Sequence, residues 1–200
     1  MKIIAIERQY DAPLHAAATE ALAASEAPSP SCQRATLLTD SALVRARTPL
    51  FIPDFALREA WILEVVPMIV ISRLGKWIES RFARRYYDAV GLAARLLPPE
   101  GIPSGAFAAN FDGAFAPGAL TLTPEEAGES LTIEAFSTSL TLGPEMLSTD
   151  STIALASRFM TLRTGDIISL CRTPLRTEPV VGSSLTATIN GREILNLKLR

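Results

Sequence analysis

The longest apolar stretch of the chain, Trp61 to Ile71, constrains the fold more than any other segment. It reads WILEVVPMIVI, and its β-branched content favours a buried strand. At 11 residues it is too short to be a membrane-spanning helix, which needs about 20 apolar residues. Pro67 cannot donate a ladder hydrogen bond, so the pattern predicts an edge position or a bulge there. Glu64 lies within the run and needs a partner if it is buried.

Short segments punctuated by turn residues surround this run. Strands are predicted at residues 2–6, 41–44, 119–123, 131–136, 137–142, 167–170, 184–189 and 193–199, the last two forming a hairpin across Asn190-Gly191. Helices are predicted at 14–27, 79–94 and 148–160, and a long loop at 98–118. These elements predict an α+β, mostly β fold. We expect one domain over 1–200, with a strand and a helix in 1–30 and a β-rich core in 31–200.

The composition of the chain limits the kinds of molecule that it is expected to bind. The net charge of −2 and the pI of about 5.5 give no electrostatic reason to expect nucleic acid or an anionic membrane. Two cysteines, without a CxxC spacing, favour neither a disulfide framework nor a zinc site. A cytoplasmic location fits this cysteine usage best. The chain has one histidine and only three lysines, which limits the acid–base chemistry it can perform.

Several segments, taken in order, resemble the fumarylacetoacetate hydrolase (FAH) family in its short, single-domain bacterial form. No segment is decisive alone, but their order and spacing extend over nearly the whole chain. The segments are KIIAI at 2–6, Tyr10 with His15, DSALV at 40–44, PLFIPDF at 49–55, RLGKWIESRFARRYYDAVGL at 73–92, FDG at 111–113, Pro117-Gly118, MTLRTGDII at 160–168, Thr173-Pro174 and VGSSLTATINGREIL at 181–195.

The resemblance implies a β-roll or barrel-like arrangement of mixed sheets with a few short helices. Members typically bind Mg²⁺ or Mn²⁺ through three carboxylates, two from a Glu-x-Glu on a strand and one from an aspartate. The metal orients and polarises a β-dicarbonyl substrate. Known activities are C–C bond hydrolysis of acylpyruvates, decarboxylation of oxaloacetate and isomerisation. The resemblance also implies a homodimer.

The family's functional positions are mostly replaced in this sequence. The first ligand is matched by Glu64, but the second falls on Val66 and the aspartate ligand on Arg95. The catalytic lysine falls on Ala109. A lone carboxylate beside a cation is a poor partner for Mg²⁺. We therefore expect no metal at this site, no cofactor and no metal-dependent reaction, with Glu64 as a vestigial ligand that forms a salt bridge with Arg95.

Other residues offer weaker alternatives. His15 matches the family's lid histidine, but its usual glutamate partner three residues on is Ala18, so His15 is read as vestigial. Cys32 and Cys171 are more often small buried side chains than nucleophiles. The arginine cluster Arg81, Arg84 and Arg85 is more typical of a solvated surface than of an anion site.

Three functional hypotheses follow. The first is a non-catalytic structural, regulatory or interaction subunit, expected as a homodimer or, more speculatively, as a heterodimer with an active paralogue. The second is an enzyme or ligand-binding protein in which Arg95 and Arg172 hold a small keto acid in a remodelled pocket. The third is an active hydrolase whose metal ligands come from Glu59, Glu100 or Asp112.

Overall fold

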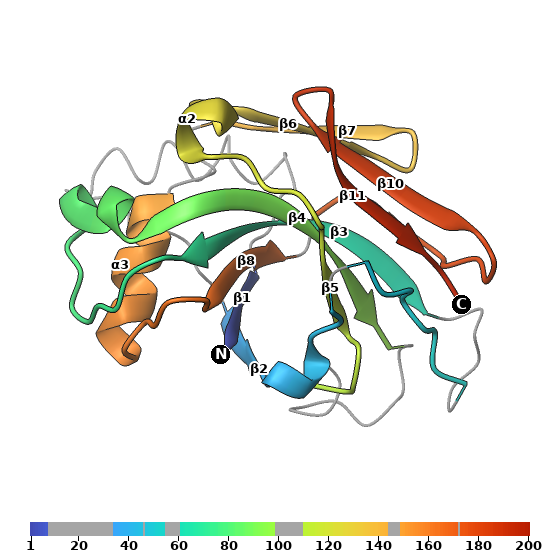
Figure 1. Ribbon diagram of the computed structural model, residues 1–200, viewed down its shortest axis with the longest axis horizontal. Coiled ribbons are helices and arrows are strands. Elements are labelled where there is room, and N and C mark those ends of the chain that lie inside the picture. The colour runs from blue at the N-terminus through green and yellow to red at the C-terminus, as the bar shows by residue number, and fades with distance from the viewer. Residues whose placement is uncertain (8–33, 46, 55–60, 99–109, 144–148, 172) are drawn as a thin grey trace, which may run out of the picture.

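The computed structural model describes residues 1–7, 34–45, 47–54, 61–98, 110–143, 149–171 and 173–200. Its larger sheet has seven strands in the order β2-β1-β8-β3-β4-β5, with β9 pairing with β3. The strands are β1 (Ile3–Glu7), β2 (Arg34–Leu38), β3 (Ile62–Ile71), β4 (Tyr87–Leu97), β5 (Phe115–Pro117), β8 (Ile167–Cys171) and β9 (Arg176–Thr177). The sheet curls into a half-barrel, visible end-on in Figure 1. A bridge between Leu43, which follows a short helical turn after β2, and Phe115 of β5 brings the two margins of the sheet together.

A second sheet covers the outer face of β3 and β4 (Figure 1). It has four antiparallel strands in the order β11-β10-β6-β7. These are β6 (Leu131–Ala135), β7 (Thr138–Leu142), β10 (Ser184–Ile189) and β11 (Arg192–Lys198). The turn from β10 to β11 places Asn190 at φ 50° and Gly191 at φ 77°. These left-handed conformations suit a tight hairpin turn, which is why Asn-Gly marks the hairpin in the sequence.

Short helices complete the described fold. They are η1 (Asp40–Ala42), η3 (Ser80–Arg85), α2 (Pro124–Ala127) and α3 (Thr149–Phe159). Helix α3 packs beside η3 at one end of the sheet (Figure 1). Thr123 and Glu126 form a reciprocal capping box that starts α2. Within the described residues, no helix is both long enough and apolar enough to cross a membrane.

Strand β3 separates two apolar cores. Alternate residues of a strand point to opposite faces. Leu63 and Val65 therefore lie in the large core between the two sheets, whereas Val66 belongs to a smaller core inside the half-barrel. The register pairs Val66 with Ala93 and Glu64 with Arg95. Glu64 thus points to the same face as Val66, toward the half-barrel.

The structure corrects the helix predicted at 79–94. Residues Ser80–Arg85 form the 3-10 helix η3, and the rest of the segment begins strand β4. Residues 90–96 are buried at every position because one face of β4 packs in the large core, with Leu92 and Ala94, and the other packs in the half-barrel core, with Ala93. A strand that is buried on both faces is apolar throughout, so it also satisfies helical spacing. The apolar spacing of Ala83, Tyr86, Tyr87 and Val90 was therefore misleading.

Three smaller expectations were also wrong. Residues 41–44 form the end of η1 and a single bridge rather than a strand. Residues 119–123 pair only at Leu122. Pro67 lies in a central strand, and the irregularity in the β3–β4 pairing falls at Val70/Ile71 instead. Pro67 is tolerated because it falls between the part of β3 that pairs with β9 and the part that pairs with β8, where no ladder needs its N–H.

The remaining strand predictions are confirmed, as is the helix at 148–160. The long loop predicted at 98–118 contains β5 at its end, and strands β2 and β9 and helix α2 were not predicted. The helix expected at 14–27 lies outside the described residues. The α+β, mostly β fold class is confirmed.

Candidate functional site

Glu64 and Arg95 occupy facing positions in the paired strands β3 and β4. Their side chains are almost completely buried, with 0% of Glu64 and 4% of Arg95 exposed. Arg95 Nη1 lies 3.9 Å from Glu64 Oε2, so the two form an ion pair. The salt bridge expected between these residues is therefore present.

A second arginine approaches Glu64 from the opposite neighbour of β3. Strand β9 pairs with β3 so that Arg176 stands beside Glu64. Its Nη2 donates a hydrogen bond of 3.1 Å to Glu64 Oε1, which also accepts one of 2.5 Å from the Thr173 backbone N–H. The Thr173 hydroxyl donates to Val65 O at 2.7 Å, which anchors the segment before β9 against β3. Arg176 was not identified from the sequence, because only strand register brings it to Glu64.

The charges at this site do not balance. Burial raises the pKa of Glu64, an effect that Arg176, Arg95 and the Thr173 N–H oppose. Two guanidinium groups face one carboxylate. Glu64 Oε2 and Arg95 Nε are buried without a hydrogen-bond partner. Even with Glu64 ionised, the cluster of Glu64, Arg95 and Arg176 carries a net positive charge, which attracts anions and repels cations.

The position of the family's second carboxylate is filled by hydrocarbon. Val66 is fully buried and belongs to the core inside the half-barrel. Neighbouring side chains in that core include Ala93, Phe115 and Cys171. A hard divalent cation needs several oxygen ligands, and here one carboxylate between two arginines is followed by an apolar wall. These residues do not fit the Mg²⁺ or Mn²⁺ that the FAH resemblance implies.

The alternative metal ligands that the sequence suggests find no support among the described residues. Asp112 lies on an exposed turn, and in that part of the chain no group of three His, Cys, Asp or Glu side chains is placed to hold a metal ion. Cys171 is buried in the apolar core, where a thiol is a poor nucleophile. The other residues singled out from the sequence lie outside the described residues: His15, Cys32, Glu59, Glu100, Ala109 and Arg172.

The arginine cluster at η3 has local partners, as the sequence predicts for a solvated surface. Arg81 Nε lies 2.8 Å from Glu79 Oε2, and both side chains are exposed. Arg84 forms an ion pair with Glu125 of α2 and lies over the Tyr87 ring at 5.2 Å. Arg85 stacks over Phe82 at 5.0 Å. Such exposed pairs contribute little to stability.

Comparison with solved structures relates the overall fold of the chain to known proteins. No protein-family model matches the chain, and no curated protein matches its sequence. A 5-carboxymethyl-2-hydroxymuconate delta-isomerase from Mycobacterium smegmatis superposes with a TM-score of 0.76 at 17% identity, covering 99% of this chain and 78% of that one. A maleylpyruvate hydrolase from Sphingobium sp. SYK-6, in complex with manganese(II) ion and pyruvate, gives 0.73 at 16% identity, covering 99% of this chain and 69% of that one.

A third similar structure carries the family name. It is a protein from Yersinia pestis CO92 assigned to the fumarylacetoacetate hydrolase family, with a TM-score of 0.74 at 19% identity, covering 100% of this chain and 93% of that one. These structures resemble the chain over nearly its whole length. The chain therefore has the fold of the fumarylacetoacetate hydrolase family.

Proposed function

We propose that this chain is a non-catalytic FAH-like protein, which has lost the family's Mg²⁺- or Mn²⁺-dependent reaction and acts as a structural, regulatory or interaction subunit. One observation carries the proposal. Glu64, the only retained ligand among Glu64, Val66 and Arg95, is bound by Arg95 and Arg176. A divalent cation would have to displace or lie beside two guanidinium groups in a buried site, where repulsion between like charges is strong.

The composition of the half-barrel core supports the same proposal. Val66 and Ala93 are paired across β3 and β4 and are fully buried. A carboxylate at position 66 would need a metal or a cation to offset its desolvation. Valine there is compatible with a dry interior, so the site is built for packing rather than for ion binding.

Turnover assays test the loss of activity. The protein would be incubated with Mn²⁺ or Mg²⁺ and either oxaloacetate or an acylpyruvate, following the absorbance of the substrate. We expect the uncatalysed rate, unchanged by Glu64→Gln. Metal-dependent turnover that Glu64→Gln abolishes would contradict the proposal, because it would show Glu64 acting as a ligand. Unfolding curves of both proteins would verify that each is folded.

A ligand-binding role is the second candidate, favoured by the excess of positive charge. Arg95 and Arg172 were the arginines expected from the sequence to hold a keto acid. Among the described residues, Arg176 flanks Glu64 on the side opposite Arg95, and 36% of its side chain is exposed. A guanidinium group at the margin of the site could exchange Glu64 for a ligand carboxylate.

Calorimetric titration with pyruvate and oxaloacetate, without metal, distinguishes this candidate. Arg176→Met removes the exposed guanidinium group, and Arg192→Met is the matched control, since Arg192 pairs with Glu126 on the surface. Binding that Arg176→Met weakens and Arg192→Met leaves unchanged would support the ligand-binding role. An absence of binding by the parent protein would exclude it for these keto acids.

The proposal includes a homodimer, the assembly that the family resemblance implies, and a heterodimer with an active paralogue as its extension. Sedimentation of the purified chain tests the first assembly. A monomer across the micromolar range would contradict the homodimer and leave the metal argument unaffected.

A further inference from the structure

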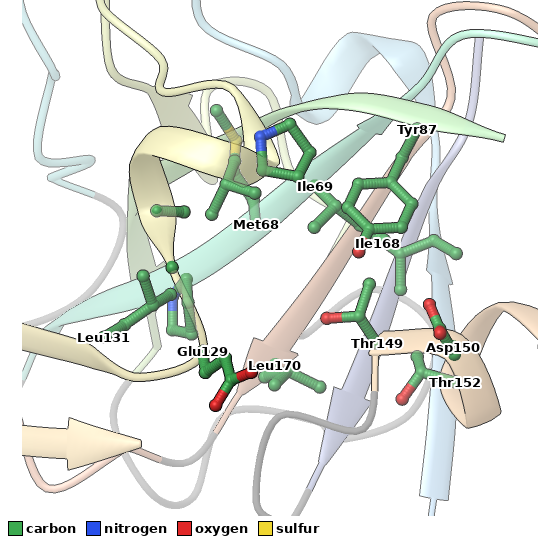
Figure 2. Close-up of a pocket in the computed structure, with 15 residues that line it drawn as sticks. Met68, Ile69, Tyr87, Glu129, Leu131, Thr149, Asp150, Thr152, Ile168 and Leu170 are labelled. Carbon is green, nitrogen blue, oxygen red and sulfur yellow. The ribbon is translucent and has the colours of Figure 1, made fainter. Parts of the chain in front are cut away.

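A cavity of about 460 Å³ lies on the other side of β3 from Glu64. It opens between the strands β3, β4 and β8 and the helices α2 and α3 (Figure 2). Pro67 and Ile69 contribute to its wall, and strand alternation places them on the face opposite Glu64 and Val66. Its size falls within the roughly 300–1,000 Å³ of small-molecule sites. The cavity is therefore separate from the Glu64, Arg95 and Arg176 cluster.

The floor of the cavity is apolar. Ile69 from β3 and Ile168 and Leu170 from β8 line it, and Leu131 from β6 closes one side (Figure 2). All four belong to, or adjoin, the large core between the sheets. A ligand body that is aliphatic or aromatic would release water from this surface, which is favourable in proportion to the apolar area covered.

The polar groups of the cavity are concentrated at the start of α3. Thr149, Asp150 and Thr152 come from this helix, and Tyr87 of β4 lies across from them (Figure 2). Asp150 Oδ1 is buried and has no hydrogen-bond partner. Burial raises the pKa of Asp150, and Arg84 only partly opposes this effect. A buried carboxylate oxygen without a donor is costly, so a ligand that brings a donor would gain from it.

The charges around the cavity favour a cationic donor. Its lining holds two carboxylates, Asp150 and Glu129, and no Lys, Arg or His among the described residues. Arg84 is nearby but is paired with Glu125. The N-terminus of α3 contributes about half a positive charge, which the full negative charge of Asp150 exceeds. The potential at this end of the cavity is therefore negative.

We propose that the cavity binds a small amphipathic amine, with its ammonium group donating to Asp150 and its apolar body against Ile69, Ile168 and Leu170. This function goes beyond the proposed loss of metal chemistry and is independent of it, because the two sites lie on opposite faces of β3. Metal binding or turnover at Glu64 would leave this proposal unchanged.

Calorimetric titration with three matched compounds tests the proposal. The probes are 2-phenylethylamine, 2-phenylethanol and 3-phenylpropanoate, which share an apolar ring and differ in the charge of the terminal group. We expect the amine to bind about tenfold or more tighter than the alcohol, as one charge-assisted hydrogen bond would give. We expect the carboxylate not to bind. Equal binding of amine and alcohol, preference for the carboxylate, or no binding of the amine at millimolar concentration would each overturn it.

Substitutions in the cavity test whether the amine binds there. Asp150→Asn should weaken amine binding about tenfold while leaving the alcohol unchanged. Asp88→Asn is the matched control, since Asp88 is exposed on β4 and does not line the cavity. Thr149→Phe should fill the cavity and weaken both compounds. Amine binding that survives both Asp150→Asn and Thr149→Phe would show that it occurs elsewhere and would overturn the proposal. Should either variant fail to fold, the comparison of the three probes on the parent protein decides alone.

Discussion

Glu64 and Arg95 face each other across β3 and β4 at the place where the fold family is expected to hold a metal ion, and Arg95 Nη1 lies 3.9 Å from Glu64 Oε2. The pair places a guanidinium cation where a metal site would have a carboxylate. An ion pair between two side chains of the protein occupies the position of the expected metal ligands. Arg176 is a second cation beside Glu64, so the net charge of the cluster is positive.

Removing one member of this pair should be worse than removing both. Glu64→Leu leaves the buried Arg95 uncompensated and should cost about 3–5 kcal/mol of unfolding free energy. Glu64→Leu combined with Arg95→Met should cost less than Glu64→Leu alone, because Arg176 is exposed enough to be solvated. Urea unfolding of the two single variants and the double variant measures the coupling. Additive effects would contradict the ion pair.

Asp166 should make the protein lose stability in acid. Burial raises the pKa of this carboxyl group, but hydrogen bonds from the Lys2 side chain and from the Arg163 and Lys2 N–H groups outweigh burial and lower it below the ordinary 3.8. A folded-state pKa below the unfolded value gives stability that is present above the unfolded value and is lost as the pH falls through the folded value.

The variant Asp166→Asn tests this linkage. It should be about 1.5–3 kcal/mol less stable than the parent at neutral pH. The difference should shrink as the pH falls through 3.8 and below. Thermal or urea unfolding at several pH values gives the profile, and Asp88→Asn, at an exposed position, is the control. A gap that is independent of pH would contradict the assignment to the Asp166 carboxylate.

Gly118 should be intolerant of a side chain. A Cβ atom there would lie 2.5 Å from Ile194 O and 3.1 Å from Leu92 O, so the chain after β5 would have to separate from both neighbours. Gly118→Ala should cost about 1–3 kcal/mol. Gly143→Ala is the matched control, because a Cβ there meets nothing within 4 Å. Equal effects of the two substitutions on the urea midpoint would show that the close approach is unimportant.

The sequence predicted elements whose signals are local. The hairpin at Asn190-Gly191 was found because its positive φ angles demand particular residues. The run at 61–71 was found because it is too apolar to be a surface segment. Strand β4 was missed because burial on both faces removes the alternation that distinguishes a strand from a helix.

The candidate site was predicted only in part, for a similar reason. Glu64, Val66 and Arg95 were identified by counting positions along the resemblance to the family. Arg176 was missed, since its role depends on the register between β9 and β3, two strands that are distant in sequence. The cavity beside α3 was also missed, because residues from β3, β4, β6, β8 and two helices line it. Such combinations follow from tertiary packing and have no local signature.

Titration with Mn²⁺ tests the central claim most directly. The parent protein would be compared with a variant carrying Val66→Glu and Arg95→Asp, which restores three carboxylates around position 64 on facing strands. Calorimetry should give no heat of binding for the parent protein and measurable binding for the variant, with circular dichroism verifying that both are folded. Tight Mn²⁺ binding by the parent protein that Glu64→Gln abolishes would contradict the account.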